Sequence, residues 1–397
     1  MKKEQELKAK LRIAIVVSHP IQHFCPQYAS WAANNGIRLK VFFGSDLGAV
    51  KYFDANFKKE INWNQLYLEE YEHEFLNGDK TLQPGKKLEA PNLDRRLTEF
   101  NPSLVVYYGY FQKLSRQAKN WARKRRIKTA YISDAEFKQK RPLWKQFIKF
   151  PFLYLFFKNT DYFLTVGDAN ETYYSFYGVP RHKMRRMHFP IDIRNYQVAF
   201  ENKEALRNQF RATHRIDENT CTLVVAGKLV DWKSQDHLIA LMKKLESEYT
   251  QQHFHLLIAG SGPMENQWKE LAGGLCTNNV SFLGFVPPEE LPAVYAAADI
   301  YIHPAKVEPH SLSVSEAIYM GCPVIVADTT GSWGNDDDVQ PGVNGFIYPW
   351  GDLNVLAEII KKMIMQNLFE KMGKWSEKIS REYQEQSHYG ILDMLDK

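Results

Sequence analysis

Two lysines stand just before a segment with the pattern of a helix, in the stretch AGKLVDWKSQDHLI (226–239). Lys228 follows the end of an apolar run, and Lys233 lies five positions later, before a helix expected to begin near Gln235 or Asp236. The N-terminus of a helix offers free N–H groups and positive potential, and ammonium groups neutralise phosphate oxygens. The spacing suits a diphosphate clamp; the alternative is two exposed lysines in a turn.

A pair of carboxylates lies in the stretch EPHSLSVSEA, which begins at Glu308. A helix is expected to begin at Ser311 or Ser313, both good N-cap types, and to end at Gly321. Glu308 then lies in the loop before the helix, and Glu316 lies one to two turns inside it. An anion bound at the helix start would have on either side a carboxylate that accepts hydrogen bonds from sugar hydroxyls. Alternatively, the two are a loop acid and a surface helix residue.

A third loop, IAGSGPMENQ (258–267), runs from an expected strand through Gly260 and Gly262 into a helix. It lacks the third glycine and the downstream acid of the GxGxxG dinucleotide fingerprint. The glycine pair allows close backbone approach to a ligand or forms a tight turn, and the pattern leaves both open.

The elements that must position these loops alternate between short apolar runs and amphipathic stretches, as β-α units on parallel sheets do. Helices are expected between the strands, for example at 236–249 and 290–298. The predicted strands are 11–18, 37–44, 103–109, 128–134 and 162–167 in the first half and 221–227, 254–260, 280–285, 299–305 and 322–328 in the second.

The fold class is therefore α/β, with two Rossmann-like, doubly wound lobes and a cleft between them. Ligands of such sheets bind beyond the carboxyl ends of the strands, where the three loops lie. The rhythm breaks at the proline in FPIDIRNY (189–196), so we predict an N-terminal domain over 1–190, a C-terminal domain over 191–375, and a last helix over 376–397 that crosses back. At 397 residues, two domains are the natural expectation.

Composition excludes several other classes. The four cysteines have no paired spacing, which argues against disulfides and a zinc site and fits a reducing compartment. The charged start MKKEQELKAK is followed by no apolar signal region, and no run of about 18 apolar residues is found. We expect a cytoplasmic protein without a spanning helix.

The second half resembles the donor domain of the family 4 retaining glycosyltransferases, which have the two-lobed GT-B fold. That family's pattern is two glutamates separated by seven residues and followed by a Gly-x-Pro-Val strand, and here it reads Glu308, Glu316 and GCPVIVA. The context occurs in the family's order: GKLVDWKSQDHLI, LLIAGSGPMENQWKELA, VSFLGFVPPEELPAVYAAADIYIHPA and GVNGFIYPWGDLNVLAEII. The resemblance covers about residues 221–366, and the ordered set is highly specific.

The resemblance implies a role for each matching residue. Lys228 and Lys233 would bind the donor diphosphate. Glu308 would contact the transferred sugar near its anomeric carbon, and Glu316 the ribose. Phe285 and Val286 would hold the base, and backbone groups of Ser311, Leu312 and Ser313 would line the phosphates. Gly260 and His310 are further expected donor contacts. Members of the family usually need no metal, so the resemblance implies no cofactor, and the nucleotide-sugar is a co-substrate.

The chain departs from the family at two places. Where many members have a glycine-rich loop after the first strand, this chain has SHPIQHF (18–24), which is similar to one bacterial branch. The family commonly has Phe-Gly where this chain has His310-Ser311, so His310 could contact the sugar and bears on its identity.

In the first lobe, His19 at the end of the first strand is the preferred catalytic candidate. His23 and Asp134 are further acceptor-side candidates, with structural or capping roles as their alternatives. By resemblance, the reaction retains anomeric configuration, while the two lysines and the helix N-terminus stabilise the leaving diphosphate.

A basic segment suggests an anionic membrane as a further partner. Residues 112–188 hold 18 Lys/Arg and 5 Asp/Glu, a local charge of +13 in a chain of net +5. Within it, KQKRPLWKQFIKFPFLYLFFK (138–158) mixes basic with large apolar residues, as an interfacial helix on an anionic membrane does, or as a buried helix with basic flanks does. The membrane interpretation implies a lipid-linked saccharide acceptor at the inner face of the cell membrane.

Two rivals remain. A nucleic-acid-binding protein would use the basic segment, but no RNA- or DNA-binding motif is present and the loops of the second half would be unexplained. A nucleotide-sugar epimerase shares the two-lobed fold but not this arrangement of loops. We therefore predict a glycosyltransferase that takes a nucleotide-diphosphate sugar and a saccharide or lipid-linked acceptor in cell-surface polysaccharide or glycoconjugate synthesis, with no nucleic-acid partner.

Overall fold

The computed structural model describes residues 11–389 and residue 391, apart from residues 56, 62, 79–81, 139–142 and 275–278. The charged start of the chain (1–10), Cys276 and the first part of the basic apolar segment (139–142) therefore lie outside the described residues. The other three cysteines are buried free thiols.

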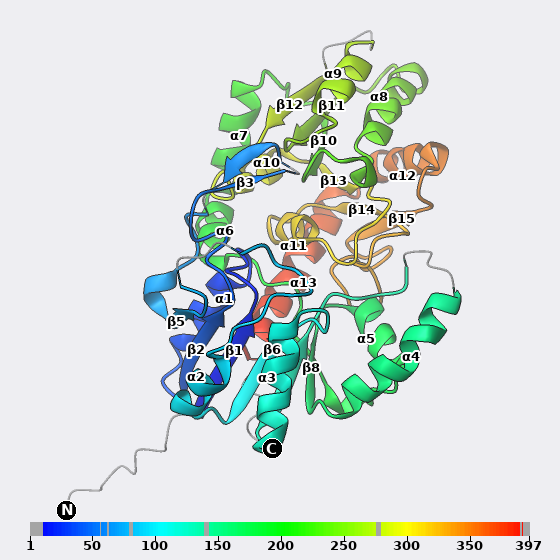
Figure 1. Ribbon diagram of the computed structural model, residues 1–397. Helices are drawn as coiled ribbons and strands as arrows, with labels where there is room; N and C mark the ends of the chain where they lie inside the picture. The colour runs from blue at the N-terminus through cyan, green and yellow to red at the C-terminus, as the bar shows by residue number, and fades with distance from the viewer. Residues whose placement is uncertain are drawn as a thin grey trace, which may run out of the picture.

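The N-terminal lobe is built on seven parallel strands in the order β5-β2-β1-β6-β7-β8-β9 (Figure 1). Helices cover both faces of this sheet with their apolar sides: α1 packs on one face and α2 to α5 on the other. The strands are β1 (Leu11–Val17), β2 (Ile37–Phe43), β5 (Glu72–Phe75), β6 (Leu104–Tyr108), β7 (Lys128–Ile132), β8 (Tyr162–Thr165) and β9 (Met184–Arg186). The helices are α1 (Cys25–Ala32), α2 (Leu93–Phe100), α3 (Lys113–Lys124), α4 (Leu143–Lys158) and α5 (Asp168–Phe176), with 3-10 turns η1 (Leu68–Glu70) and η2 (Arg181–Lys183).

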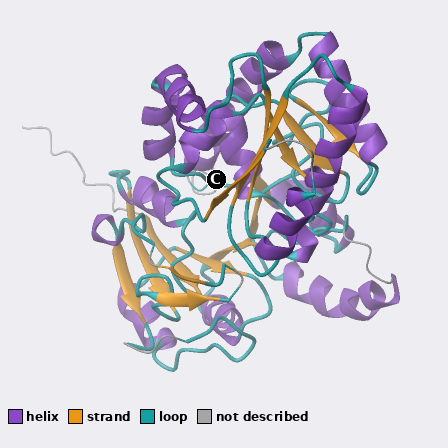
Figure 2. Cartoon of the chain, turned by 90° about the horizontal axis from the view of Figure 1, so that it is seen from above, coloured by secondary structure: helices purple, strands orange, loops and turns teal. Residues whose placement is uncertain are grey.

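The C-terminal lobe repeats this plan with six parallel strands in the order β12-β11-β10-β13-β14-β15. Helices lie on both sides of the sheet (Figure 2). Helices α8, α9 and α12 contribute to the core on one face, and α6, α10 and α11 to the core on the other. The strands are β10 (Cys221–Ala226), β11 (Phe254–Ala259), β12 (Val280–Gly284), β13 (Ile300–His303), β14 (Val324–Ala327) and β15 (Gly345–Tyr348). The helices are α6 (Ile193–Glu201), α7 (Lys203–Thr213), α8 (Asp236–Glu248), α9 (Glu265–Gly273), α10 (Leu291–Ala297), α11 (Leu312–Tyr319) and α12 (Leu353–Met365), with the 3-10 turn η3 (Asp231–Lys233).

The last helix, α13 (Phe369–Tyr389), touches both lobes. Its side chain Tyr383 stacks on His188 with ring centroids 3.5 Å apart, and its Ser387 carbonyl accepts a 3.3 Å hydrogen bond from Trp31 of α1. The predicted boundaries after residues 190 and 375 stay predictions, and the second falls inside α13.

All ten predicted strands and the predicted helices at 236–249 and 290–298 are present. The prediction missed the edge strands β5, β9 and β15 and a two-stranded antiparallel hairpin of β3 (Tyr52–Asp54) and β4 (Lys59–Ile61). Within the described part of the chain, no helix has both the length and the apolar character that crossing a bilayer requires.

Candidate active site

The predicted functional loops meet where the strand order of the C-terminal sheet reverses, between β10 and β13. Ligands of doubly wound sheets bind at this switch point, beyond the carboxyl ends of the strands. Lys228 and Lys233 lie in the loop after β10, and Glu308 lies in the loop after β13. In the N-terminal lobe the order reverses between β1 and β6, and His19 and His23 follow β1.

A cavity of about 420 Å³ opens at this place, between the lobes. All eleven predicted donor residues line it, together with Gln22, His23 and Phe189 from the N-terminal side and the hinge. The sequence did not point to several other wall residues, namely Phe57, Trp63, Pro288, Leu291 and Tyr295. The structure shows that these eleven residues line one cavity, and their individual roles stay predictions.

Lys233 and Glu308 form an ion pair at the floor of the cavity. Glu308 Oε2 also lies 3.4 Å from Nε2 of the buried His303 at the end of β13. Burial, with a contribution from Lys228, lowers the pKa of Lys233 to about 8. Burial and the Lys233 charge hold the pKa of His303 well below its usual value, so beside Lys233 this histidine is neutral at neutral pH.

Glu316 is buried one turn inside α11, where its Oε2 accepts a 2.8 Å hydrogen bond from the Tyr295 hydroxyl. Burial raises its pKa to about 7 because the carboxylate is removed from water. The expected surface-residue alternative does not hold for this side chain, since it is only 8% exposed and faces the cavity.

The start of α11 faces the same cavity. Ser311 takes the extended N-cap conformation, as predicted, and Leu312 is the first helical residue. The two glycines at the end of β11 let the neighbouring loop close in: a Cβ on Gly260 would overlap the Gly227 carbonyl, and one on Gly262 would overlap the Leu229 carbonyl. Both glycines are therefore required for backbone contact between the loops after β10 and β11, whatever ligand they bind.

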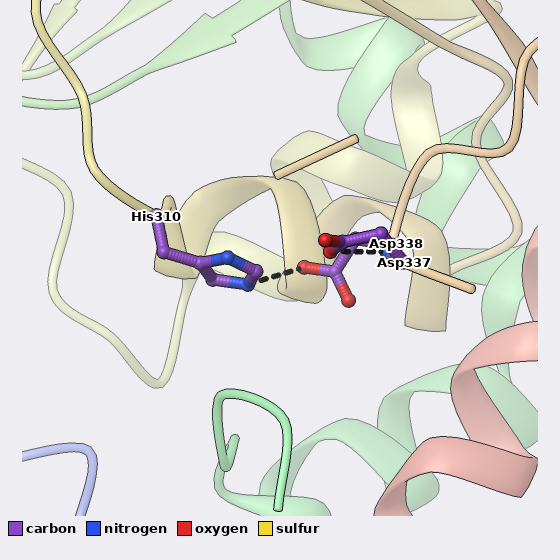
Figure 3. A group of neighbouring side chains, drawn as sticks. All are labelled: His310, Asp337 and Asp338. Carbon is purple, nitrogen blue, oxygen red and sulfur yellow. Dashed lines mark hydrogen bonds and ion pairs between the residues drawn. The ribbon is translucent and has the colours of Figure 1, made fainter. Parts of the chain in front are cut away.

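His310 points away from solvent into a buried polar cluster (Figure 3). Its Nε2 lies 3.1 Å from Asp338 Oδ2, which also accepts a 2.6 Å hydrogen bond from Ser315. Burial acts to lower the pKa of His310, but the hydrogen bond and charge of Asp338 outweigh it and raise the pKa. His310 also stacks on Phe189, with ring centroids 5.0 Å apart.

Among the described residues, His310, Asp337 and Asp338 are the group whose ligand atoms come close enough, within 4.8 Å, to hold a metal ion. Their atoms already have internal partners, since Asp337 Oδ2 accepts a 2.7 Å hydrogen bond from the Asp168 backbone N–H. A metal would have to displace these hydrogen bonds, so the donor set fits a closed polar network better than a metal centre.

The three acceptor-side candidates do not all line a cavity. His23 and Asp134 line a second cavity of about 320 Å³, which shares His23 and Phe189 with the larger one. His19, the preferred candidate, is not among the lining residues of either cavity; its Nδ1 is 2.8 Å from the Ser18 hydroxyl. Burial lowers the pKa of His19 to about 4 and that of His23 to about 3, so both are neutral at neutral pH.

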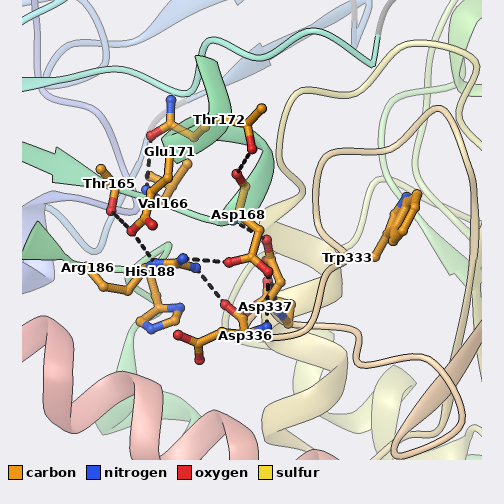
Figure 4. A network of polar contacts seen from close by, with 12 residues as sticks. Thr165, Val166, Asp168, Glu171, Thr172, Arg186, His188, Trp333, Asp336 and Asp337 are labelled. Atoms are coloured by element: carbon orange, nitrogen blue, oxygen red, sulfur yellow. Dashed lines mark hydrogen bonds and ion pairs between the residues drawn. The ribbon is translucent and has the colours of Figure 1, made fainter. Parts of the chain in front are cut away.

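A network of ion pairs and hydrogen bonds joins the lobes beside the site (Figure 4). Arg186 of β9 pairs with Asp168 at 2.6 Å and with Glu171 at 2.9 Å, and it donates a 2.6 Å hydrogen bond to the Asp336 carbonyl. The neighbouring Asp337 binds the first turn of α5 through the Asp168 N–H. The loop 334–338 therefore connects the His310 cluster to the N-terminal lobe.

Residues 207–381 match the family described as glycosyl transferases group 1. An uncharacterized glycosyltransferase of Methanocaldococcus jannaschii is 25% identical over 207 residues, 48% of this chain and 52% of that protein. A GDP-mannose-dependent monoacylated alpha-(1-6)-phosphatidylinositol monomannoside mannosyltransferase of Corynebacterium glutamicum is 30% identical over 187 residues, 45% of this chain and 46% of that protein. The chain thus spans about half the length of the curated relatives it matches.

The crystal structure of Anabaena Alr3699/HepE in complex with UDP superposes with a TM-score of 0.69 at 18% sequence identity, and the match covers 97% of this chain and all of the other (100%). At this identity the likeness concerns the fold. The predicted two-lobed GT-B fold is confirmed.

Proposed function

Because residues 207–381 match the glycosyl transferases group 1 family, we propose that the chain transfers a sugar from a nucleotide-diphosphate sugar to a saccharide or lipid-linked saccharide. The observation that carries the proposal is the single cavity lined by both lysines, both glutamates and the start of α11. A relative whose name gives it as GDP-mannose-dependent and a protein of similar fold crystallised with UDP support a nucleotide-sugar donor without fixing its base.

The charges of the cavity suit a leaving diphosphate. Lys228, Lys233 and the N–H groups at the start of α11 would stabilise the negative charge that builds up as the glycosidic bond breaks. These fixed positive groups perform the task that a metal performs elsewhere, so we propose a metal-independent reaction. We also propose retention of configuration, with the acceptor hydroxyl attacking from the face of the leaving group and a phosphate oxygen accepting its proton.

The second cavity is the proposed acceptor site, because it adjoins the first at His23 and Phe189. Of the predicted first-lobe residues, His23 and Asp134 are placed to contact an acceptor there. The lipid-linked acceptor named for the Corynebacterium relative supports a lipid-linked acceptor for this chain. The product would then enter cell-surface polysaccharide or glycoconjugate synthesis.

The epimerase alternative is less well supported, because the family match rests on the sequence and not on the fold alone. The two functions differ in one simple observation. An epimerase converts a nucleotide-sugar with no acceptor present, whereas the proposed transferase needs an acceptor to form its sugar product.

Donor binding is the direct test. A donor that binds only the folded protein, at a free concentration of about 100 times its Kd, should add about 2.7 kcal/mol to the free energy of unfolding. This gain should raise the melting temperature by a few degrees. We expect at least one of UDP-glucose, UDP-galactose, UDP-N-acetylglucosamine and GDP-mannose to do so in differential scanning fluorimetry, and single-stranded RNA of equal charge not to. If only the RNA shifts the melting temperature, the nucleic-acid alternative is correct.

Helix α4 supports the proposal of a peripheral membrane contact. Its side chains Phe147, Ile148 and Leu155 are 69%, 67% and 60% exposed, and Trp144 is 59% exposed. Its opposite side, with Leu153 and Phe157, belongs to the lobe's core. The exposed Lys149 and Lys158 of α4 and the 18 Lys/Arg against 5 Asp/Glu in residues 112–188 complement an anionic lipid surface, which we propose at the inner face of the cell membrane.

Liposome sedimentation tests this contact. We expect the protein to sediment with vesicles containing phosphatidylglycerol, less at high salt, and replacement of Phe147, Ile148 and Leu155 by serine to weaken binding at least about tenfold, because apolar area no longer enters the interface. The matched control replaces three exposed apolar residues of the C-terminal lobe, Val198, Leu271 and Met365, and should bind as the wild type does. Absence of salt-sensitive binding, or equal loss in both variants, would contradict the proposal.

A further inference from the structure

The β3–β4 hairpin belongs to the N-terminal lobe by sequence, yet it lies against the C-terminal lobe (Figure 1). It joins neither large sheet. An ion pair of 2.6 Å between Lys51 and Glu60 links its two arms, and both of these side chains are more than 60% exposed. This exposed pair lies within the hairpin and does not connect it to the C-terminal lobe.

The tip of the hairpin is bound to the loops after β10 and β11. Asp54 Oδ2 forms a 3.0 Å ion pair with Lys228 Nζ, and Asp54 Oδ1 accepts a 3.1 Å hydrogen bond from the Phe57 N–H. The Phe57 carbonyl accepts a 3.1 Å hydrogen bond from the Ser261 hydroxyl. Asp54 is well covered, with its side chain only 13% exposed.

The hairpin also contacts Phe285, which together with Val286 is predicted to hold the nucleotide base. The rings of Phe57 and Phe285 meet edge to face with centroids 5.2 Å apart, and Lys59 Nζ lies 4.8 Å from the Phe285 centroid. Phe57 and Trp63 line the large cavity itself. The hairpin thus touches both ends of the proposed nucleotide site, namely Lys228 at the diphosphate and Phe285 at the base.

We infer that this hairpin is a lid on the donor site, and that Asp54 occupies the position that a diphosphate oxygen of the donor would take on Lys228. The inference rests on the proposed function. A carboxylate oxygen 3.0 Å from an ammonium nitrogen makes the same charge-assisted contact that a phosphate oxygen makes. Because a diphosphate and Asp54 carry like charges, both cannot share Lys228 without repulsion, so the donor must displace Asp54 and move the hairpin tip.

The direct test removes the competing charge and keeps the turn. Asp54→Asn retains a side-chain oxygen for the Phe57 N–H but no longer forms the ion pair. We expect it to bind UDP, GDP and inorganic pyrophosphate about three- to tenfold more tightly than the wild type in isothermal titration calorimetry, the range that a partly buried ion pair provides. The matched control is Glu60→Gln, which removes an equal charge from the same hairpin without touching Lys228 and should leave binding within twofold.

A second variant guards against a folding defect in the first. Ser261→Ala loosens the lid from the opposite lobe by removing the hydrogen bond to the Phe57 carbonyl, and it should tighten binding of the same probes by a smaller factor. If the wild type binds a nucleotide but neither Asp54→Asn nor Ser261→Ala binds it more tightly, the lid inference is wrong and the proposed function stands. If none of the proteins binds any of the three probes, the proposed function fails, and the lid inference fails with it.

Discussion

Sugar transfer is expected to fall by at least about 100-fold when Glu308 is replaced by alanine, and by a similar factor when Lys233 is replaced. The two side chains form one ion pair on the cavity floor, so each variant leaves a buried charge without its partner and removes one proposed contact to the donor. The loss should appear in kcat as well as in KM, because both groups are proposed to act on charge that develops during transfer. Initial rates with the donor found by thermal stabilisation give the measurement.

The ion pair also decides how the two losses combine. If Lys233 and Glu308 act as a unit, the double variant should be no slower than the slower single variant. The control is the pair Lys40–Glu74 in the N-terminal sheet, which has a 2.8 Å separation and similar exposure, 23% and 21%, but does not line the cavity. Its alanine variants should transfer sugar within about twofold of the wild type, as expected of a partly exposed ion pair remote from the site. A folded Glu308→Ala protein that transfers at the wild-type rate would show that the site assignment is wrong.

The predictable part of this fold follows from local sequence. Strands such as β1 and β10 are continuous apolar runs because both faces of a parallel sheet are buried, and periodicity is sufficient to find them. Two of the missed strands, β9 and β5, lack this signal: β9 is Met-Arg-Arg, and β5 alternates acidic residues with His73 and Phe75. Such edge strands are strands because a neighbour provides hydrogen bonds, and their own composition does not reveal it.

The same division holds for the site. Lys228, Glu308 and Gly260 could be placed together from the sequence because each lies in the loop after a predicted strand, and β10 is the neighbour of both β11 and β13. Phe57 and Asp54 could not, because 174 residues separate Asp54 from Lys228 and nothing in the hairpin's composition names its partner. The order of preference between His19 and His23 also depended on side-chain direction, which strand-end position does not determine; the structure places His23, and not His19, at both cavities.

The connection between the lobes gives the largest expected effect on stability. The Arg186 side chain is 10% exposed and contacts two carboxylates and a carbonyl, with one contact crossing between the lobes (Figure 4). In the wild type, the Glu171 side chain is 7% exposed and pairs with Arg186 and with Arg181, whose side chain is 79% exposed. Arg186→Ala therefore leaves the exposed Arg181 as the remaining cation beside Glu171. Breaking a buried network from one side leaves an uncompensated charge, and we expect the free energy of unfolding to fall by about 3–5 kcal/mol.

Urea denaturation followed by circular dichroism measures this loss, and Arg186→Lys separates charge from geometry. Lysine restores the positive charge but cannot bind Asp168, Glu171 and the Asp336 carbonyl at once, so it should recover only part of the lost stability. Arg38→Ala is the matched control, because the pair of Arg38 with Glu72 is similarly short at 2.7 Å but about half exposed, at 49% and 46%. Its loss should cost about 0–1 kcal/mol. Since the loop 334–338 carries both the Asp336 contact and the aspartates that hold His310, Arg186→Ala should also weaken donor binding at temperatures where the protein is still folded. Equal losses of stability in Arg186→Ala and Arg38→Ala would mean that the network does not hold the lobes together.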